Sequence, residues 1–219
     1  MPQKHVGRPP RTSRAEILAA ARALIDRDGW DKLTIRRLAT EAGVGAMTIY
    51  HHVRDREDLL VQLLNDHVAK VPRPPLPAEP RERIAAAALA MRDALAAWPW
   101  AAEVVTTDGF VGRLSDSALW MVEAVVAGAA EAGCTTEQSV EVFRHVWYYT
   151  VGEVLVRAHS RRSAGDTPRP APDLAASAHP HLAAVGDRWA PLAARDTYPE
   201  GVRALVAGLL SAPAAAAGA

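Results

Sequence analysis

One stretch decides the fold of the N-terminal part: LTIRRLATEAGVGAMTIYHHVRDR, residues 33–56. It predicts two short helices joined by a tight turn. Thr34 is suited to begin the first helix, because its hydroxyl can accept a hydrogen bond from an unpaired backbone N–H. Ile35, Leu38 and Ala39 then share one apolar face. Gly43 is expected to end this helix, because the left-handed conformation needed there is one that glycine adopts freely.

The second helix of the pair is expected to bury Ile49 and Val53, which lie four residues apart. Its start and outer face then carry Gly45, Ala46, Met47, Thr48, Tyr50, His51 and His52. A short helix with such a face, and with basic residues at both ends, suits the major groove of DNA. The alternative is an ordinary helix pair in an α-helical domain, because helix pairs broken by glycine are common.

The residue types in this stretch favour DNA binding more strongly than their spacing does. They resemble the helix-turn-helix of the tetracycline-repressor (TetR) family, in which Leu-Thr-x-Arg-x-Leu-Ala is followed by Gly-Val and by Thr-Leu-Tyr-x-His-Val with a basic, acidic, basic step. This chain has residues 33–39, 43–44 and 48–56 at those positions. It departs from the pattern at two positions. Relatives often have a side chain that contacts bases at the position of Ala46, and a proline at the position of Met47. The operator sequence therefore stays open.

The resemblance implies which residues of this unit face DNA: Thr34, Arg36, Gly45, Ala46, Met47, Thr48, Tyr50, His51, His52, Arg54 and Arg56. We expect Thr48, Tyr50 and the arginines to bind phosphates. Ala46 and Met47 can touch thymine methyl groups.

The chain before the first helix forms a basic arm. Residues 1–14 include Arg8 and Arg11, several prolines and no acidic residue. Gly7-Arg8-Pro9-Pro10 is similar to the Gly-Arg-Pro core that lies in narrow A·T minor grooves. The arm is therefore a candidate for contacts with phosphates or the minor groove. The alternative is a frayed, solvated terminus.

Capping signals and prolines divide the rest of the chain into domains. Ser13 and Glu16 have the spacing of a capping box, which opens the first helix of a three-helix unit. Together with a linking helix that starts at Asp55, this predicts a helix-turn-helix DNA-binding domain over residues 15–71. Five prolines between positions 72 and 80 mark a boundary, because proline interrupts a helix.

Residues 81–211 predict a larger helical domain. Its longest helix is expected from Thr135 or Thr136 to about Ser160, and its last from Tyr198 to Leu210. Alanine is abundant and β-branched runs are scarce, which favours helix over strand. The predicted fold class is therefore all-α, with the helix-turn-helix domain followed by a helical domain for ligand binding and dimerisation.

Composition excludes several classes of protein. Hydrophobic residues make up 49% of the 219 residues and charged residues 23%, and the formal net charge is zero. Any nucleic-acid surface must then be local. We find no candidate membrane span or secretion signal and a single cysteine, Cys134, so a cytoplasmic protein is expected. No catalytic triad, nucleotide motif or metal-ligand spacing is present, which predicts no enzyme activity, no cofactor and no metal.

The larger domain is rich in aromatic residues. The candidate ligand-binding residues are Trp98, Trp100, Phe110, Trp120, Phe143, Trp147, Tyr148 and Thr150. His145, Glu153 and Arg144 are further candidate polar anchors. The alternative is a plain core, because an aromatic residue at helical spacing more often packs than binds. The family resemblance implies a pocket for a small hydrophobic or amphipathic effector.

A homodimer is expected for two reasons. A single helix-turn-helix makes too few contacts with DNA for tight specific binding. Such proteins usually bind a palindromic site as two-fold symmetric dimers. The apolar faces of the longest and last helices can pair as a four-helix bundle between subunits. The hypothesis is a dimeric repressor that a small molecule releases from double-stranded operator DNA. The alternatives are a DNA-binding regulator without an effector, and a ligand-binding or catalytic domain whose N-terminal unit is only structural.

Overall fold

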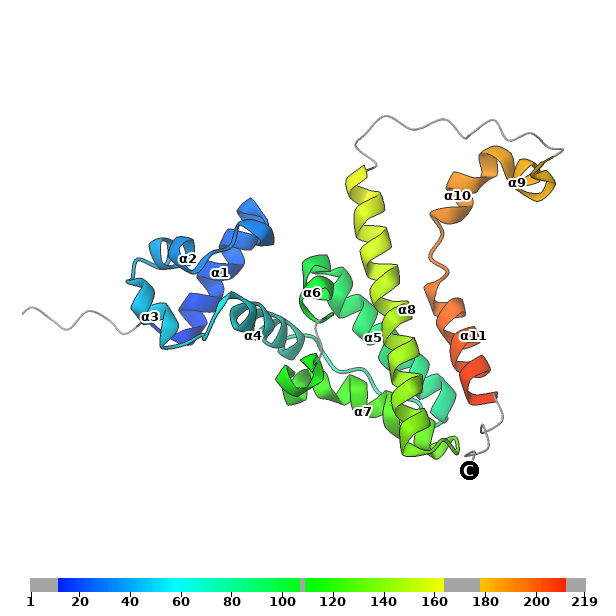
Figure 1. Cartoon of the computed structure of the whole chain (residues 1–219). Helices are drawn as coiled ribbons and strands as arrows, with labels where there is room; N and C mark the ends of the chain where they lie inside the picture. Colours follow the sequence, from blue (N-terminus) through cyan, green and yellow to red (C-terminus); the bar gives the residue numbers. More distant parts are fainter. Residues whose placement is uncertain (1–11, 107–108, 164–177, 212–219) are drawn as a thin grey trace, which may run out of the picture. The chain divides into compact units, whose positions relative to one another are not determined.

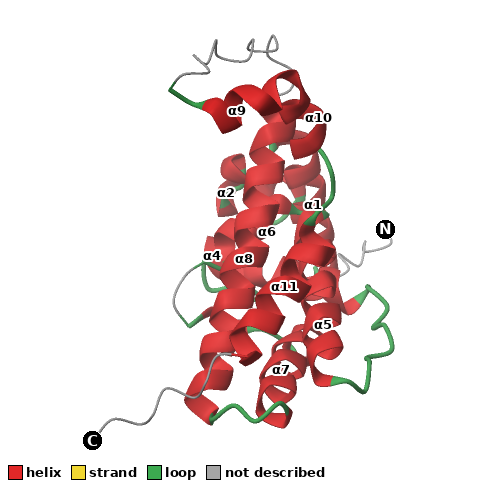
Figure 2. Cartoon of the chain, turned by 90° about the vertical axis from the view of Figure 1, so that its right-hand side faces the viewer, coloured by secondary structure: helices red, strands yellow, loops and turns green. Residues whose placement is uncertain are grey.

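The computed structural model describes residues 12–106, 109–163 and 178–211. All regular elements within these ranges are helical, which confirms the predicted all-α class (Figure 2). The chain forms two compact units. The first contains residues 1–72 together with 100–119, and the second contains residues 73–99 together with 120–219.

The first unit contains the predicted helix-turn-helix. Its elements in chain order are α1 (Arg14–Asp28), the 3-10 turn η1 (Trp30–Lys32), α2 (Ile35–Glu41), α3 (Ala46–Tyr50), α4 (Arg56–Ala69) and the 3-10 turn η2 (Phe110–Arg113) (Figure 1). The short α6 (Pro99–Val104) lies at the boundary between the units, and α7 (Asp116–Glu131) runs from the first unit into the second.

Local capping explains where the helices of the first unit begin. The Ser13 side chain accepts a bond from the Glu16 amide, and the Glu16 carboxylate accepts one from the Ser13 amide, so the capping box is confirmed. Asp55 caps α4 by accepting a hydrogen bond of 2.7 Å from the Asp58 amide. The buried core of this unit comes from α1, α2, α3 and α4, and its fully buried members include Ile17, Leu38, Ile49 and Leu59.

The second unit is built around three helices that pack against one another: α5 (Pro80–Ala96), α8 (Thr136–Ser163) and α11 (Tyr198–Ser211) (Figure 1). The observed ends of α8 and α11 lie within three residues of the predicted ones. Two further helices, α9 (Pro180–Val185) and α10 (Trp189–Ala193), flank the 3-10 turn η3 (Gly186–Arg188).

Tyr198 joins the three main helices of the second unit. Its side chain is fully buried, and its hydroxyl lies 2.6 Å from Thr150 Oγ1 of α8 and donates to the Ala88 carbonyl of α5 at 3.3 Å. Tyr149 stacks on its ring with centroids 5.2 Å apart. Burial raises the pKa of Tyr198 to about 12, so its phenol stays neutral at ordinary pH and remains a hydrogen-bond donor.

Gly201 allows α11 to approach α8 closely. A Cβ atom at this position would lie 2.0 Å from the Tyr149 hydroxyl. Any larger residue would therefore have to push Tyr149 off its stacked position against Tyr198. Arg203 of α11 also donates to Glu82 of α5 at 3.1 Å, so α11 is joined to both helices.

Candidate functional site

The turn of the helix-turn-helix has the geometry that its sequence predicts. Thr34 caps α2, because its hydroxyl accepts a hydrogen bond of 3.2 Å from the Arg37 amide. Gly43 has a φ of 66°, in the left-handed region, and the following Val44 amide donates to the Ala39 carbonyl at 3.0 Å. The chain can turn sharply here because glycine adopts this conformation without a steric penalty.

The outer face of α3 is exposed although part of it is apolar. Met47 is 72% exposed and Tyr50 is 53% exposed, while Ile49 between them is fully buried. Arg36, Gly45, Ala46 and His51 are also exposed, and Thr48 and His52 are half-buried. Large apolar side chains left in solvent on a five-residue helix gain nothing for the fold of the protomer. They therefore mark α3 as a candidate contact surface.

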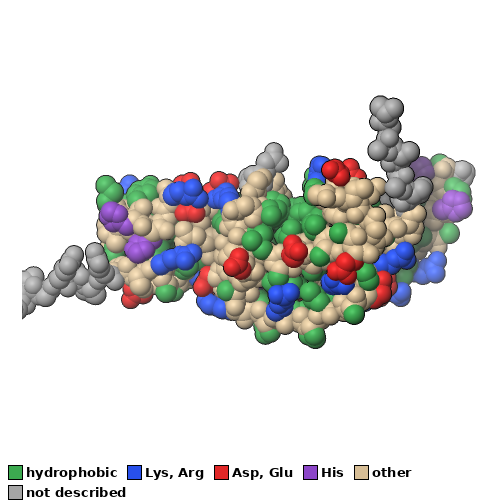
Figure 3. Space-filling view, turned by 90° about the horizontal axis from the view of Figure 1, so that it is seen from below, with side chains coloured by type: hydrophobic (Ala, Val, Ile, Leu, Met, Phe, Trp, Pro, Cys, Tyr) green, Lys and Arg blue, Asp and Glu red, His purple; other side chains and the backbone are tan. Residues whose placement is uncertain are grey.

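Charge on the first unit is mixed. On the face shown in Figure 3, basic and acidic side chains lie close together instead of forming one continuous basic patch. Arg54 follows α3 in the chain, and its side chain is 80% exposed and pairs with Asp58 at 3.5 Å. It is therefore available to an incoming phosphate. Two further predicted basic contacts, Arg8 and Arg11, lie outside the described residues.

Arg56 has a structural task that the sequence did not indicate. Its guanidinium lies 4.9 Å from the centre of the Trp30 ring and donates to the carbonyls of Trp30 and Leu33 at 2.6 and 2.8 Å. These bonds tie the start of α4 to η1 and to Leu33, which precedes the N-cap residue of α2. Arg56 Nε and Nη2 are therefore engaged inside the unit, and a contact of Arg56 with DNA stays a prediction.

Replacing Arg56 with alanine should lower the free energy of unfolding by about 2 kcal/mol, because two carbonyls lose a charged donor. Arg54→Ala should change stability by less than about 0.5 kcal/mol, since Arg54 is exposed. Chemical denaturation of the two variants makes the comparison. Equal stabilities would show that the Arg56 contacts do not brace the unit.

The predicted ligand-binding residues are packed as core or point outward. Trp98, Trp100, Phe143 and Trp147 are buried, with Phe143 stacked on Trp147 at a centroid distance of 6.4 Å. Phe110 and Trp120 are half-buried, and Arg73 lies 4.8 Å from the centre of the Trp120 ring. Trp100 and Phe110 belong to the first unit, while the others belong to the second.

Two of these predictions need correction. Tyr148 is 59% exposed and its hydroxyl accepts a bond from Arg144, so it does not line an interior pocket. Thr150 is buried, but its hydroxyl donates to the Val146 carbonyl and lies against the Tyr198 hydroxyl. Thr150 therefore binds the core together instead of offering a free polar anchor. Helical spacing alone did not reveal that Tyr148 is exposed and that Thr150 is buried.

A charged cavity of about 300 Å³ lies in the second unit, between α5, α8 and the segment that leads into α11. Its lining residues are Arg92, Asp93, Ala96, Pro99, Glu153, Val154, Arg157, Ala158, Arg161 and Asp196. Of the residues considered from the sequence, Glu153 alone lines it. The spacing of Glu153, Arg157 and Arg161, four residues apart on α8, was a signal that could have indicated a row of charges on one helix face.

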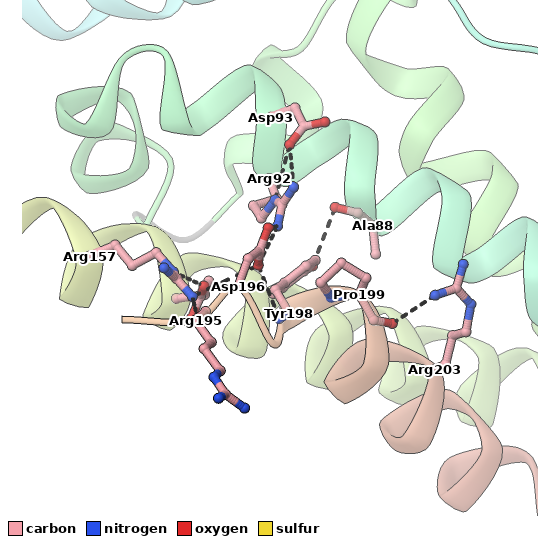
Figure 4. Close-up of polar contacts among 10 residues, drawn as sticks. Ala88, Arg92, Asp93, Arg157, Arg195, Asp196, Tyr198, Pro199 and Arg203 are labelled. Carbon is pink, nitrogen blue, oxygen red and sulfur yellow. Dashed lines mark hydrogen bonds and ion pairs between the residues drawn. The ribbon is translucent and has the colours of Figure 1, made fainter. Parts of the chain in front are cut away.

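Ion pairs connect the walls of this cavity (Figure 4). Arg92 holds both oxygens of Asp196 at 3.0 and 2.9 Å, and Arg157 pairs with Glu153 and donates to the Arg195 carbonyl. Burial by itself raises the pKa of the Asp196 carboxyl. The hydrogen bonds from Arg92 and from the Tyr198 amide outweigh burial, so the pKa lies below its ordinary value.

Two family models match almost the whole chain. The model of bacterial regulatory proteins of the tetR family matches residues 17–63, and the model of the tetracyclin repressor-like C-terminal domain matches residues 74–212. The chain belongs to the TetR family. It is therefore a transcriptional regulator with a helix-turn-helix DNA-binding domain, and the family resemblance inferred from residues 33–56 is confirmed.

Individual proteins resemble the chain to different extents. An uncharacterised transcriptional regulator of Mycobacterium tuberculosis is 46% identical over 26% of this chain and 26% of its own length. A regulator of Saccharopolyspora erythraea is 32% identical over 70% of this chain and 64% of its own length. The chain therefore matches less than two thirds of the length of both. A possible TetR-family regulator of Streptomyces coelicolor has a similar structure, with a TM-score of 0.66 and 28% identity, covering 90% of this chain and 98% of that one.

Two further observations concern the part of the chain that the structure describes. None of the helices there has the length and hydropathy needed to cross a membrane. No group of three or more His, Cys, Asp or Glu side chains is arranged there to hold a metal ion.

Proposed function

We propose that the protein is a ligand-responsive repressor that binds a palindromic operator as a homodimer and leaves it when a small molecule binds the second unit. The observation that carries this proposal is the exposed outer face of α3, with Met47 and Tyr50 in solvent at the end of a helix-turn-helix. The second family model supports the effector part of the proposal, since it describes a tetracyclin repressor-like domain.

On DNA, the residues of α3 and its flanks divide into two groups. Thr48, Tyr50 and Arg54 carry hydroxyl and guanidinium donors, and we assign them to phosphates. Ala46 and Met47 have apolar side chains at the exposed start of α3, and we assign them to thymine methyl groups in the major groove.

The dimer is proposed to form through the outward faces of α8 and α11. On α8 the exposed stripe includes Tyr148, Gly152 and Val156, and on α11 it includes Ala204 and Gly208. Small residues on α11 permit close helix packing, and the aromatic and branched residues on α8 supply apolar area. Two copies of this face make a four-helix bundle related by a two-fold axis.

For a small molecule to release the operator, it must bind the arrangement that cannot bind DNA more tightly than the arrangement that can.

The second candidate function is that of a TetR-family regulator that responds to no effector. The packed state of the predicted ligand-binding residues favours it, because Trp98, Phe143 and Trp147 are buried and Thr150 has its hydroxyl bound within the core.

The DNA-binding part is tested with two matched arginine variants. Arg54 and Arg22 are both paired with an aspartate four residues later, at 3.5 and 3.0 Å, but only Arg54 lies beside α3. Genomic fragments selected by the purified protein supply the operator. Arg54→Ala should weaken operator binding about tenfold or more and reduce the salt slope by about one per subunit, because one phosphate contact is lost in each half-site.

Arg22→Ala should leave both operator affinity and salt slope unchanged. Binding measured at several salt concentrations makes the comparison. If no genomic fragment is selected, or if the two variants lose affinity equally, the proposed DNA interface is wrong.

A further inference from the structure

The charged cavity of the second unit already holds a carboxylate from the chain itself. Asp196 enters it from the segment before α11 and places both oxygens on Arg92 (Figure 4). It also lies 3.8 Å from the Arg157 guanidinium. Both contacts come from Arg92 Nη1, because Nε and Nη2 of the same guanidinium donate to Asp93 Oδ1 at 3.0 and 2.8 Å. Charge-assisted hydrogen bonds from arginine to a carboxylate are stronger than neutral ones.

The Asp196 carboxylate is not enclosed by the protein. Its side chain is 53% exposed, and residues 191–197 around it are all exposed. Because water already reaches the carboxylate, it can leave the cavity without passing through an apolar barrier. The same does not hold for Arg92, whose side chain is 18% exposed and lies against the buried Tyr198 ring at 5.0 Å. The arginine stays when the aspartate moves.

The charge balance of the cavity changes when Asp196 leaves. Its lining then contains three arginines and two carboxylates, Asp93 and Glu153. One positive charge is left in excess, and Arg161 forms no ion pair with any other residue in the described ranges. A ligand with a single negative charge restores neutrality, whereas a cationic ligand does not.

The remaining lining residues indicate the size and polarity of the uncharged part of such a ligand. Ala96, Pro99, Val154 and Ala158 supply small apolar surfaces. A volume of about 300 Å³ lies at the low end of the range for small-molecule sites. The complementary molecule is therefore compact and apolar, with its charge at one end.

We propose that this cavity binds a small organic monocarboxylate, whose carboxylate takes the place of Asp196 on Arg92 and Arg157. The inference rests on the proposed function, for which it names the chemical class of the effector. Displacement of Asp196 breaks the bonds that hold the segment before α11 to α5. Since α11 supplies half of the proposed dimer face, the ligand acts on the element that sets the distance between the two DNA-binding units.

The test measures ligand binding by the full chain without DNA. Calorimetric titration uses benzoate, 3-phenylpropionate and hexanoate as probes, each with its neutral amide, and benzylamine as a cationic probe. The carboxylates should bind at least tenfold more tightly than the amides, and benzylamine should not bind. Asp196→Asn should bind the carboxylates about tenfold more tightly than the parent protein, because the competing charge is gone while an oxygen remains for the Tyr198 amide.

Glu82→Gln is the matched control. Glu82 also pairs an arginine across α5 and α11, through Arg203, but it does not line the cavity. The Glu82→Gln variant should bind the carboxylate probes with the same affinity as the parent protein. The inference is overturned if no carboxylate binds at millimolar concentration, if the amides bind equally well, or if Asp196→Asn does not strengthen binding.

These outcomes are separate from those of the proposed function. Release of the operator by compounds of another class, without carboxylate binding, would overturn the inference and leave the repressor proposal standing. Tight carboxylate binding by a protein that selects no DNA would overturn the repressor proposal and leave the carboxylate site standing.

Discussion

Tyr198→Ala is expected to lower the free energy of unfolding of the second unit by about 3–5 kcal/mol, which makes it the most damaging single substitution considered for this unit. The side chain is fully buried where α5, α8 and α11 meet. Its removal leaves a cavity, takes away the stacking partner of Tyr149 and deprives the Ala88 carbonyl of a donor. Denaturant unfolding followed by circular dichroism measures the loss.

Tyr198→Phe separates packing from hydrogen bonding. The ring stays in place and Thr150 still donates to the Val146 carbonyl, so the expected cost is about 1 kcal/mol. Tyr50→Ala serves as the exposed control, with an expected change below about 0.5 kcal/mol. If Tyr198→Ala costs as little as Tyr50→Ala, the interpretation of Tyr198 as the joint of three helices is wrong.

Val156→Glu is expected to convert the proposed dimer into monomers and to reduce operator affinity by at least about a hundredfold. Val156 is 64% exposed in the protomer, so a carboxylate there is solvated and the fold is retained. In a two-fold dimer the same substitution occurs in both copies and brings two negative charges into one apolar interface. Burial of unpaired charges costs several kcal/mol. A monomer also contacts only one half-site at a time.

Val140→Glu is the control on the same helix. Val140 is 48% exposed and lies sixteen residues earlier on α8, which turns it by about 160° away from Val156. Sedimentation equilibrium should show a dimer for Val140→Glu and a monomer for Val156→Glu. A dimeric Val156→Glu protein would mean that the subunits pair through another surface.

The elements that were predicted well depend on neighbouring residues. Ser13 with Glu16, Thr34 with Arg37 and Gly43 each act within three or four positions of themselves. Their types alone therefore reveal where α1 begins, where α2 begins and where the turn to α3 lies. The buried Ile49 and the exposed Tyr50 follow in the same way from helical period.

The residues whose structural role the sequence did not reveal have environments that come from distant parts of the chain. Arg56 has the sequence position of a DNA contact but donates to carbonyls 23 and 26 positions earlier. Tyr148 and Thr150 lie two positions apart on α8, yet one is exposed and the other is buried against α11. Periodicity shows that α8 has several apolar sides but not which neighbour covers each.

By itself, the sequence determined the all-helical class and the helix-turn-helix, because those properties follow from short-range capping, glycine conformation and helical period. The family was indicated by the resemblance of residues 33–56 to the TetR motif. Only the tertiary structure decided that Arg56 braces the first unit, that Tyr198 joins three helices, and that Arg92 and Asp196 share a cavity. Arg92 and Asp196 are 104 positions apart. No local signal carries such a pairing, because it exists only after α5, α8 and α11 have packed.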